Sequence, residues 1–346
     1  MEPALLVRLT PTGPWRIGPE SGARDHVESI LHSDTLFSAL CSAFVRLGRL
    51  DEWLDATLRK PSAPEVRLTS CFPSLDGQRF VVPPRSLWPP LTSAKVRWKG
   101  AKCVPLPVVQ SLVAGENLAE GSWVVDGPSE CLVPADRPRG PFRPALRSSA
   151  AVDRLTGCAA PHTTACLEFA DGGGMWTVAA FADDAAKERW TPRIKEAFRL
   201  LADSGFGGER SSGWGRSAAP EFEEGILPNL ILAPREPVPA PVEGEEAPPP
   251  PETAWWLLSL FSPSLDDTVD WNRGDYALSL RSGRTESSAG WGAPKKSTRM
   301  LTEGSVIFAG QPVCGVALDV TPEGFPHPVY RAGYAVSIPI PWRATT

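Results

Sequence analysis

The stretch GFGGERSSGWGR, residues 205–216, contains five glycines within one short segment. Glycine loses more conformational freedom on folding than any other residue, so this density indicates a backbone path that side chains would forbid. A tight turn of this kind can direct several N–H groups at one phosphate. The stretch lacks the GK[ST] ending of a P-loop, and it does not open a helix after a strand, as a dinucleotide-binding loop does. An ordinary helix-to-strand loop is the alternative interpretation.

The side chains of the same stretch favour a nucleic acid as the ligand. Arginine and serine contact phosphate oxygens, and tryptophan offers a face on which a base or an arginine can stack. The glycines would act through their N–H groups and the arginines through their charge. The candidate RNA-binding residues here are Gly205, Gly207, Gly208, Arg210, Ser211, Ser212, Gly213, Trp214 and Arg216.

The residues before this stretch predict a helix and two strands. The helix is expected to begin with Thr191 as its cap and Pro192 at its first position, and to end at Gly205. Apolar residues recur at helical spacing on its inner face, namely Ile194, Ala197, Phe198 and Leu201. The strands are ACLEFA at 165–170 and MWTVAAF at 175–181, and the DGGG between them predicts a hairpin turn.

The N-terminal residues continue this alternation of strand and helix. ALLVRL at 4–9 has the pattern of a strand, and a second helix is expected with Ser33 as its cap. Its buried stripe follows helical spacing through Leu36, Leu40, Phe44 and Leu47. Strand, helix, strand, strand, helix, strand is the order of a ferredoxin-like fold, which RNA-recognition domains share. The fold class predicted is α+β.

Length and proline content predict the domain organisation. The chain has 346 residues, of which 38 are proline, so long uninterrupted helices are not expected. At about 150 residues per domain, two domains are expected. The proline-rich, acidic stretch at 234–252 is expected to be a linker or loop, because it has too few large apolar side chains to fold. It separates a domain over 1–233, with an irregular insertion at about 67–147, from a mostly strand domain over 253–346.

Positive charge is concentrated in two segments of a chain that is acidic overall. The formal net charge is −5, which argues against indiscriminate nucleic-acid binding. Residues 77–115 contain no carboxylate, and residues 137–154 contain five arginines against Asp153 alone. Such segments would attract a polyanion, and a pair of solvated basic loops is the alternative interpretation.

Cysteine spacing and hydropathy indicate a reduced, cytoplasmic protein. The seven cysteines are scattered without a CxxC pair. The N-terminal residues do not have the form of a secretion signal, and no apolar run is long enough to span a membrane. Cys158, His162 and Cys166 have a spacing that zinc would accept, but a fourth ligand is not apparent. Ordinary buried thiols are therefore favoured, and no metal or cofactor is expected.

Several segments, taken together, resemble a known family. GFGGERSSGWGR after a helix is similar to the glycine-rich loop of the RAMP superfamily of CRISPR RNA-binding proteins. HSDTLFSALC at 32–41 and RSSAAVDRLTG at 147–157 resemble the first helix and the central motif of the fourth subunit of the type III-A Csm effector complex. WLLSLFSPS at 256–264, MLTEGSVIF at 300–308 and HPVYRAGYAVSIP near the end resemble its C-terminal domain. The equivalent subunit of type III-B (Cmr) complexes is the nearest alternative.

The resemblance implies both a fold and a function. It implies two ferredoxin-like domains, the first with a β-hairpin thumb and the glycine-rich loop. It also implies a non-catalytic subunit that holds the 5′ handle of the CRISPR RNA, beside the large Palm-domain subunit and the backbone RAMP subunit, in antiviral defence. We expect the thumb within 80–115, with AKVRWKGAK as a strand and Trp98 as a wedge or stacking partner. The further RNA-binding residues are then His32, Ser33, Lys95, Arg97, Lys99, Lys102, Arg147 and Arg154.

His32 raises the alternative of an endoribonuclease, because some RAMP proteins cut precursor CRISPR RNA with a general-base histidine. Such a histidine should lie near a second acid–base group and be reachable by a 2′-hydroxyl. His32 instead precedes Ser33 and Asp34 at a predicted helix start, where capping or phosphate binding is the commoner duty. We therefore expect no catalytic residue. A scaffold that touches only protein is the other competing class.

Overall fold

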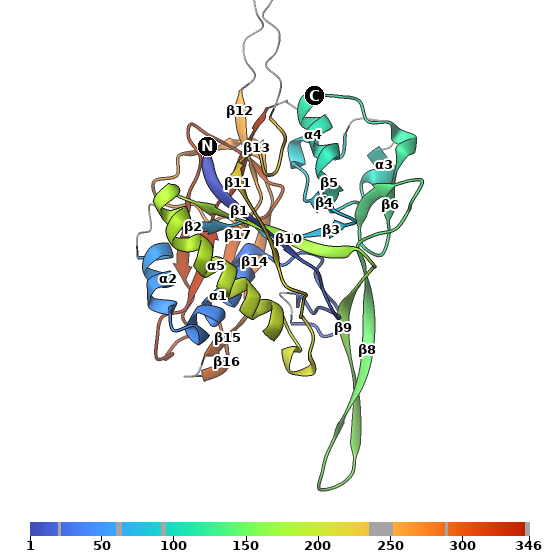
Figure 1. Cartoon of the computed structure of the whole chain (residues 1–346), viewed down its shortest axis with the longest axis vertical. Helices are drawn as coiled ribbons and strands as arrows, with labels where there is room; N and C mark the ends of the chain where they lie inside the picture. The colour runs from blue at the N-terminus through green and yellow to red at the C-terminus, as the bar shows by residue number, and fades with distance from the viewer. Residues whose placement is uncertain (20–21, 60–63, 91–94, 235–251, 288–289, 343–346) are drawn as a thin grey trace, which may run out of the picture.

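The computed structural model describes residues 1–19, 22–59, 64–90, 95–234, 252–287 and 290–342. It is a mixed α+β fold that is rich in sheet and has few helices (Figure 1). The linker or loop predicted at 234–252 lies almost wholly outside the described residues. All seven cysteines are free in this structure. No helix in the described part of the chain is long and apolar enough to cross a membrane.

A seven-stranded sheet lies at the centre of the N-terminal half, and its neighbouring strands are antiparallel. The order across it is β11 (Glu221–Leu227), β1 (Glu2–Leu9), β10 (Gly173–Phe181), β3 (Phe72–Leu75), β4 (Gln78–Val81) and β5 (Val104–Pro105), and β2 (Val66–Leu68) also pairs with β10. The strands predicted at 4–9 and 175–181 are confirmed as β1 and β10. The first strands of the irregular segment predicted at about 67–147 thus belong to this sheet.

Different parts of the chain cover the two faces of this sheet. From β1, Leu5 and Val7 point into a core shared with α1 (Ser33–Arg46), α2 (Leu50–Thr57) and α5 (Asp184–Ser204). Ala4 and Leu6 point into a second core, which the C-terminal half and the insertion complete. Successive side chains of a strand face opposite sides of its sheet. Burial on both sides therefore accounts for the unbroken apolar run of β1.

Helix α1 begins at Ser33, but Ser33 is not its cap as predicted. His32 occupies the cap position without a side-chain hydrogen bond to the helix. The Ser33 hydroxyl instead accepts a hydrogen bond from the Leu260 N–H at 3.0 Å. The hydroxyl predicted to cap the helix therefore makes a tertiary contact. The predicted stripe is confirmed, with Leu36, Leu40 and Phe44 buried and Leu47 half-buried.

Helix α5 is longer than predicted. The Asp183 carboxylate caps it by accepting a hydrogen bond from the Ala186 N–H at 2.7 Å. The helix therefore starts at Asp184, and the prediction of Thr191 as cap and Pro192 as first residue is wrong because Pro192 lies inside the helix. An earlier aspartate cap outweighs the usual preference of proline for a first turn. The predicted inner face is confirmed as buried at Ile194, Ala197, Phe198 and Leu201.

A long hairpin leaves the body of the molecule. Its strands, β8 (Phe142–Val152) and β9 (Ala159–Phe169), pair along their whole length and project well beyond the other elements (Figure 1). The strand predicted at 165–170 overlaps the inner end of β9. The DGGG turn does not close a hairpin, contrary to prediction, because β9 pairs with β8 while β10 joins the central sheet. A short alternating pattern does not specify which strand is the partner.

The predicted thumb within 80–115 is wrong, because AKVRWKGAK is not a strand. It contains the short helix α3 (Lys95–Trp98). The Trp98 side chain is only 1% exposed, and its ring stacks on Trp88 with 6.0 Å between centroids, so it cannot act as a wedge. This segment belongs to a compact insertion whose other elements are η1 (Arg85–Leu87), α4 (Leu106–Ala114), η2 (Glu120–Ser122), β6 (Trp123–Asp126) and β7 (Cys131–Pro134).

The C-terminal half consists of strands, without a helix among the described residues 252–287 and 290–342. A four-stranded sheet has the order β13 (Val269–Asp275), β18 (Val306–Ala309), β12 (Thr253–Leu257) and β21 (Ser337–Pro341). Two-stranded pairs complete it: β14 (Leu278–Arg281) with β17 (Thr298–Leu301), β15 (Arg284–Ser287) with β16 (Gly290–Pro294), and β19 (Gly315–Asp319) with β20 (Tyr330–Tyr334). A second ferredoxin-like domain would need two helices, which this described part does not contain.

Candidate nucleic-acid interface

The glycine-rich loop at 205–216 folds back on itself. Gly205 and Gly215 have φ angles of +94° and +81°, which side chains rarely tolerate. A Cβ on Gly215 would lie 2.0 Å from the Phe206 carbonyl oxygen, and one on Gly205 would lie 2.4 Å from the Trp214 carbonyl oxygen. These two positions require glycine because main chain approaches main chain inside the loop.

The loop also packs on the segment at 14–17, which sequence reasoning did not single out. Gly208 N–H donates to the Arg16 carbonyl at 2.9 Å, and Gly215 N–H donates to the Pro14 carbonyl at 2.9 Å. The Trp15 ring stacks on Phe206 with 5.1 Å between centroids. Several of the N–H groups predicted to bind phosphate are therefore used within the protein.

The outer edge of the loop retains groups that could bind a ligand. The N–H groups of Gly207, Arg210 and Ser211 make no hydrogen bond to another residue of the described chain. Ser211, Ser212 and Arg216 are exposed, whereas Gly213 and Trp214 are half-buried. Arg210, in the short helix η3 (Arg210–Ser212), forms an ion pair with Glu286. A phosphate would thus meet the edge at 207–212 rather than the whole loop.

The base of the hairpin lies against the same 14–17 segment. Trp15 N–H donates to the Leu167 carbonyl at 3.1 Å, and Leu167 N–H donates back to the Trp15 carbonyl at 2.7 Å. Leu167 belongs to β9, so one short segment contacts both the glycine-rich loop and the hairpin. The sequence carries no signal for this, because Pro14 to Ile17 match no motif and the contacts are largely main-chain.

Two arginines on β8 give the hairpin base a positive surface. Arg143 Nη2 lies 3.0 Å from Glu168 Oε2, and Arg147 forms an ion pair with the same carboxylate. The hydrogen bond from Arg143, followed by the charge of Arg147, holds the pKa of Glu168 below its ordinary value. Both arginine side chains are more than half exposed, at 72% and 55%. One carboxylate thus faces two cations on this part of β8.

Arg154, also predicted to bind RNA, lies apart from the glycine-rich loop. It lies in the exposed turn that joins β8 to β9. β8 extends for 11 residues, which at about 3.3 Å per residue places this turn roughly 35 Å beyond the hairpin base. The Asp153 carboxylate accepts hydrogen bonds from Leu155 N–H and the Thr156 hydroxyl at 2.8 and 2.9 Å, within the same turn.

The basic residues at 95–102 lie elsewhere. Figure 1 shows α3 within the insertion, away from the hairpin turn. Arg97 Nη2 is 3.5 Å from Glu120, and Lys102 Nζ is 2.6 Å from Glu130. Lys99 is exposed, and Lys95 opens the helix. The structure therefore does not bring these four residues together with the glycine-rich loop.

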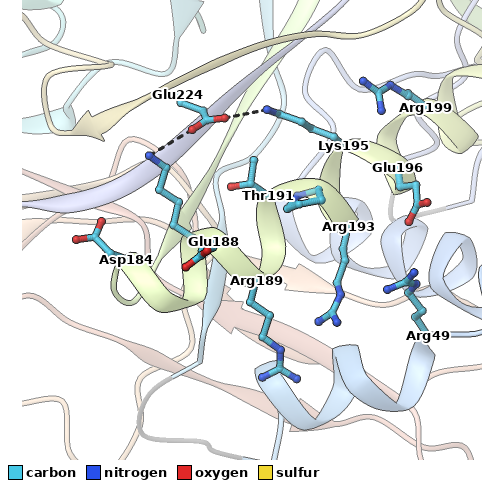
Figure 2. A pocket seen from close by; sticks show the side chains of 12 residues that line it. Arg49, Asp184, Glu188, Arg189, Thr191, Arg193, Lys195, Glu196, Arg199 and Glu224 are labelled. Carbon is cyan, nitrogen blue, oxygen red and sulfur yellow. Dashed lines mark hydrogen bonds and ion pairs between the residues drawn. The ribbon is translucent and has the colours of Figure 1, made fainter.

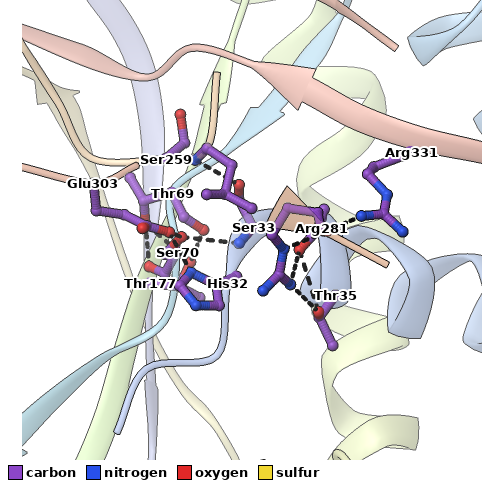
Figure 3. A network of polar contacts seen from close by, with 12 residues as sticks. His32, Ser33, Thr35, Thr69, Ser70, Thr177, Ser259, Arg281, Glu303 and Arg331 are labelled. Atoms are coloured by element: carbon purple, nitrogen blue, oxygen red, sulfur yellow. Dashed lines mark hydrogen bonds and ion pairs between the residues drawn. The ribbon is translucent and has the colours of Figure 1, made fainter. Parts of the chain in front are cut away.

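His32 and Ser33 lie in a buried polar network between the two halves of the chain (Figure 3). His32 Nδ1 is 2.8 Å from Glu303 Oε1, and the Ser70 hydroxyl donates to the same carboxylate. Burial opposes protonation of His32, but the charge and hydrogen bond of Glu303 outweigh it and raise the pKa of His32. The Glu303 side chain is only 3% exposed. Both predicted residues therefore bind groups inside this chain rather than facing a surface for RNA.

A second ion pair strengthens this junction. Arg281 Nη2 and Nε donate to the two carboxylate oxygens of Asp34 at 2.8 and 3.1 Å, and Arg331 Nη1 lies 3.8 Å from Asp34 Oδ2. Burial would raise the pKa of Asp34, but the charges and hydrogen bonds of the arginines lower it. Asp34 follows the helix start, whereas both arginines come from the C-terminal half, so the network fixes the two halves against each other.

The zinc alternative does not fit the fold. Cys158 and Cys166 stand at the two ends of one extended stretch that includes His162 in β9. Each step of four residues along a strand covers about 13 Å, whereas zinc ligands lie within about 2.3 Å of the ion. The three residues cannot share one ion in this conformation. Within the described residues, no group of three His, Cys, Asp or Glu side chains could hold a metal.

A groove with a volume of about 890 Å³ follows the outer face of α5 (Figure 2). Lys187 and Lys195 both contact Glu224, at 3.3 and 2.9 Å, and Arg193 contacts Glu52 at 3.1 Å. Carboxylates thus compensate these cations within the protein. Charge compensation makes this groove a weaker candidate for an RNA site than the glycine-rich loop and the hairpin base.

These features define a class of protein. A sheet-rich α+β chain with a glycine-rich loop after its second long helix, beside the base of a projecting hairpin, has the architecture expected of the RAMP superfamily. The comparisons with known proteins agree with this class and narrow it.

The comparisons point to the Csm4 family. Residues 251–340 match the CRISPR Csm4 C-terminal domain. The whole chain resembles solved structures of a Csm3-Csm4 subcomplex of the type III-A interference complex (TM-score 0.62, 14% identity, 98% of this chain and 99% of that chain) and of a Csm1-Csm4 cassette with cA4 (TM-score 0.57, 16% identity, 98% of each chain). No curated protein sequence matches significantly. The resemblance to the fourth subunit of the type III-A complex, inferred from sequence, is thereby confirmed.

Proposed function

We propose that this chain is a non-catalytic, RNA-binding subunit of a type III-A CRISPR effector complex. It holds the 5′ handle of the CRISPR RNA and docks the large Palm-domain subunit and the backbone RAMP subunit in the cytoplasm, as part of antiviral defence. The N-terminal half serves as the ferredoxin-like module. The match of residues 251–340 to Csm4 favours type III-A over type III-B.

The juxtaposition of the glycine-rich loop with the hairpin base carries this proposal. The two segments meet on the 14–17 segment through main-chain hydrogen bonds of 2.7 to 3.1 Å. Together they present unused N–H groups and three exposed arginines, namely Arg143, Arg147 and Arg216. Main-chain donors and arginines on one surface suit a ribose–phosphate chain, because phosphate contacts position the strand without reading its sequence. The hairpin at 142–169 replaces the segment at 80–115 as the proposed thumb.

The solved structures that this chain resembles support the docking of protein partners. They are complexes of Csm4 with Csm1 and of Csm4 with Csm3. The likeness extends over nearly the whole length of both chains, so this chain shares the fold that docks those partners. Co-purification with the two partner subunits tests this part of the proposal.

A binding experiment tests the RNA part. Fluorescence anisotropy compares an RNA that carries the repeat-derived handle at its 5′ end with a matched RNA that carries the same segment at its 3′ end. We expect tighter binding of the 5′-handle RNA. Arg216→Gln and Arg147→Gln should each weaken it and reduce the slope of log K against log salt by about 0.7. Arg59→Gln, at the exposed end of α2, is the matched control. Equal binding of both RNAs would contradict the proposal.

The absence of catalysis is supported by the setting of His32. A general base must be within reach of the proton that it removes. His32 is hydrogen-bonded to Glu303 at the junction of the two halves, and its side chain is 18% exposed. Incubation of the purified protein with repeat RNA tests this directly. Cleavage that disappears in His32→Ala would establish the endoribonuclease alternative.

A further inference from the structure

Arg16 is a buried arginine at the centre of the proposed interface. Its residue is 8% exposed, and burial lowers the pKa of its guanidinium, although the group remains charged at neutral pH. Within the described residues, its hydrogen-bond acceptors are main-chain carbonyl oxygens of Ala23, Arg24 and Ala165, at 2.8, 3.0 and 2.9 Å. A buried charge is costly unless hydrogen bonds satisfy it, so these three bonds fix the guanidinium in one place.

The three acceptors join two separate segments. Ala165 lies on β9 at the hairpin base, whereas Ala23 and Arg24 lie in the stretch before α1. Ala165 N–H also donates to the Arg24 carbonyl at 2.7 Å. The planar guanidinium therefore closes a small main-chain cluster, which lysine could not reproduce with its single nitrogen.

The main chain and stem of Arg16 contact the glycine-rich loop. Gly208 N–H donates to the Arg16 carbonyl at 2.9 Å. A Cβ on Gly207 would lie 2.2 Å from the same carbonyl oxygen, and one on Gly208 would lie 3.2 Å from Arg16 Cδ. The glycines at these positions thus let the loop lie directly on Arg16. One residue touches the loop with its main chain and stem and the hairpin with its head group.

We infer that Arg16 is the positioning residue that holds the glycine-rich loop and the hairpin base as one rigid surface for RNA. The inference rests on the proposed function for its ligand and on the contacts above for its mechanism. Arg16 acts through its neighbours, because its guanidinium is occupied by carbonyl groups and turned away from solvent. Its charge is therefore not one of the charges that neutralise phosphate.

Salt dependence separates positioning from direct contact. Arg16→Lys keeps the positive charge and most of the stem but loses the fork of donors. We expect it to weaken binding of the 5′-handle RNA by roughly tenfold or more, the scale on which a lost charged hydrogen bond acts, with the slope of log K against log salt unchanged. Arg216→Gln should reduce that slope by about 0.7. A slope that falls equally in Arg16→Lys would mean direct phosphate contact and would overturn the inference.

Amide hydrogen exchange on the full chain without RNA supplies the second readout. In Arg16→Lys we expect faster exchange at Gly208 and at Ala165 together, because both segments lose the same anchor. Gly207→Ala disrupts the same contact from the loop and should also speed exchange at Gly208 and Ala165 together. This variant tests the inference if Arg16→Lys does not fold. Unchanged exchange, or a change confined to one segment, would overturn the inference. If the parent protein binds no RNA, the proposed function fails while the exchange result still tests Arg16.

Discussion

The buried pair of His32 and Glu303 makes stability depend on pH in a definite direction. The pKa of His32 is raised above 6.5, so its contribution is complete below that value and is lost as pH rises through the folded pKa. The pKa of Glu303 is lowered below 4.5, so its contribution is complete above that value and is lost as pH falls through the folded pKa. Both contributions are fully present between about pH 4.5 and 6.5.

His32→Gln should therefore destabilise the protein more at about pH 6 than at about pH 9. Glutamine keeps a hydrogen-bonding group near Glu303 but cannot carry the positive charge that the pair needs. Chemical denaturation of parent and variant at both pH values measures the difference in unfolding free energy. His26→Gln is the control, since the His26 side chain is 75% exposed. A loss of stability that is equal at the two pH values would contradict the ion pair.

Asp34→Asn should cost about 3–5 kcal/mol of unfolding free energy, the range for removing one partner of a buried ion pair. Asp34 and Arg281 are 6% and 5% exposed, so solvent cannot replace the lost charge. Asp51→Asn, an exposed position at 93%, provides the control. Urea denaturation gives both values, and a change below about 1 kcal/mol in Asp34→Asn would show that the pair adds no more than a surface bridge does.

Sequence reasoning could place Asp34 and His32 at a helix start but could not find their partners. Arg281 and Glu303 lie more than two hundred residues away in the chain. An aspartate in the first helical turn already has a local explanation in the helix dipole. A residue with a sufficient local role gives no reason to look for a distant one.

At the scale of elements, α5 contains a proline that should destabilise the helix. Pro192 lies inside the helix and removes one main-chain hydrogen bond. Pro192→Ala should raise the unfolding free energy by about 1–3 kcal/mol, because proline is about 3 kcal/mol less favourable than alanine in a helix interior. Thermal unfolding measures the shift. Pro192→Gly restores the same N–H but should stabilise less by about 1 kcal/mol. A lower melting temperature in Pro192→Ala would mean that proline is needed at this position.

The glycine-rich loop allows a matched test of strain against steric contact. Gly213 and Gly215 both have φ of +81°, but a Cβ on Gly213 meets nothing within 4 Å, whereas one on Gly215 lies 2.0 Å from the Phe206 carbonyl oxygen. Gly213→Ala should cost about 1 kcal/mol from strain alone. Gly215→Ala should cost clearly more, since main chain must move. Equal costs for the two variants would show that the loop is not packed as described.

Elements whose apolar residues recur at regular spacing could be predicted from the sequence. The pairing of strands with one another could not. The inner faces of α1 and α5 follow from spacing alone, whereas β10 is a short, mostly apolar run that is buried throughout. AKVRWKGAK was expected as a strand because the resemblance implies a hairpin thumb and this segment contains four basic residues, yet it contains the short helix α3, with Trp98 stacked on Trp88. β8 was not predicted as a strand, because its exposed residues alternate little in polarity.

At the scale of the whole molecule, the two halves of the chain share one core. Phe72 and Trp176 from the central sheet and Trp256 from β12 belong to the same buried cluster. Trp256 Nε1 also donates to the Val82 carbonyl at 3.2 Å. We expect calorimetry to show one cooperative unfolding transition for the chain. Two separate transitions would contradict the shared core.

Trp256→Ala should lower the free energy of unfolding by about 3–5 kcal/mol, the usual cost of truncating a buried tryptophan. Because the core is common, the same loss should appear in probes from both halves, such as exchange at β10 and at β18. Trp271→Ala is the control, since the Trp271 side chain is 41% exposed. The prediction of two domains from the proline-rich stretch did not include this shared core. Composition indicates a boundary in the sequence but not the contacts across it.

The projecting hairpin carries a natural attachment point for a probe. Cys158 stands in its turn and is exposed, whereas the other six cysteines are buried or half-buried, and burial raises the pKa of the Cys41 thiol to about 12. A maleimide dye added to the unaltered chain should therefore react first at the far end of the hairpin. Energy transfer from that dye to a fluorophore on an RNA end would then report how far along the guide the hairpin reaches, without any engineered residue.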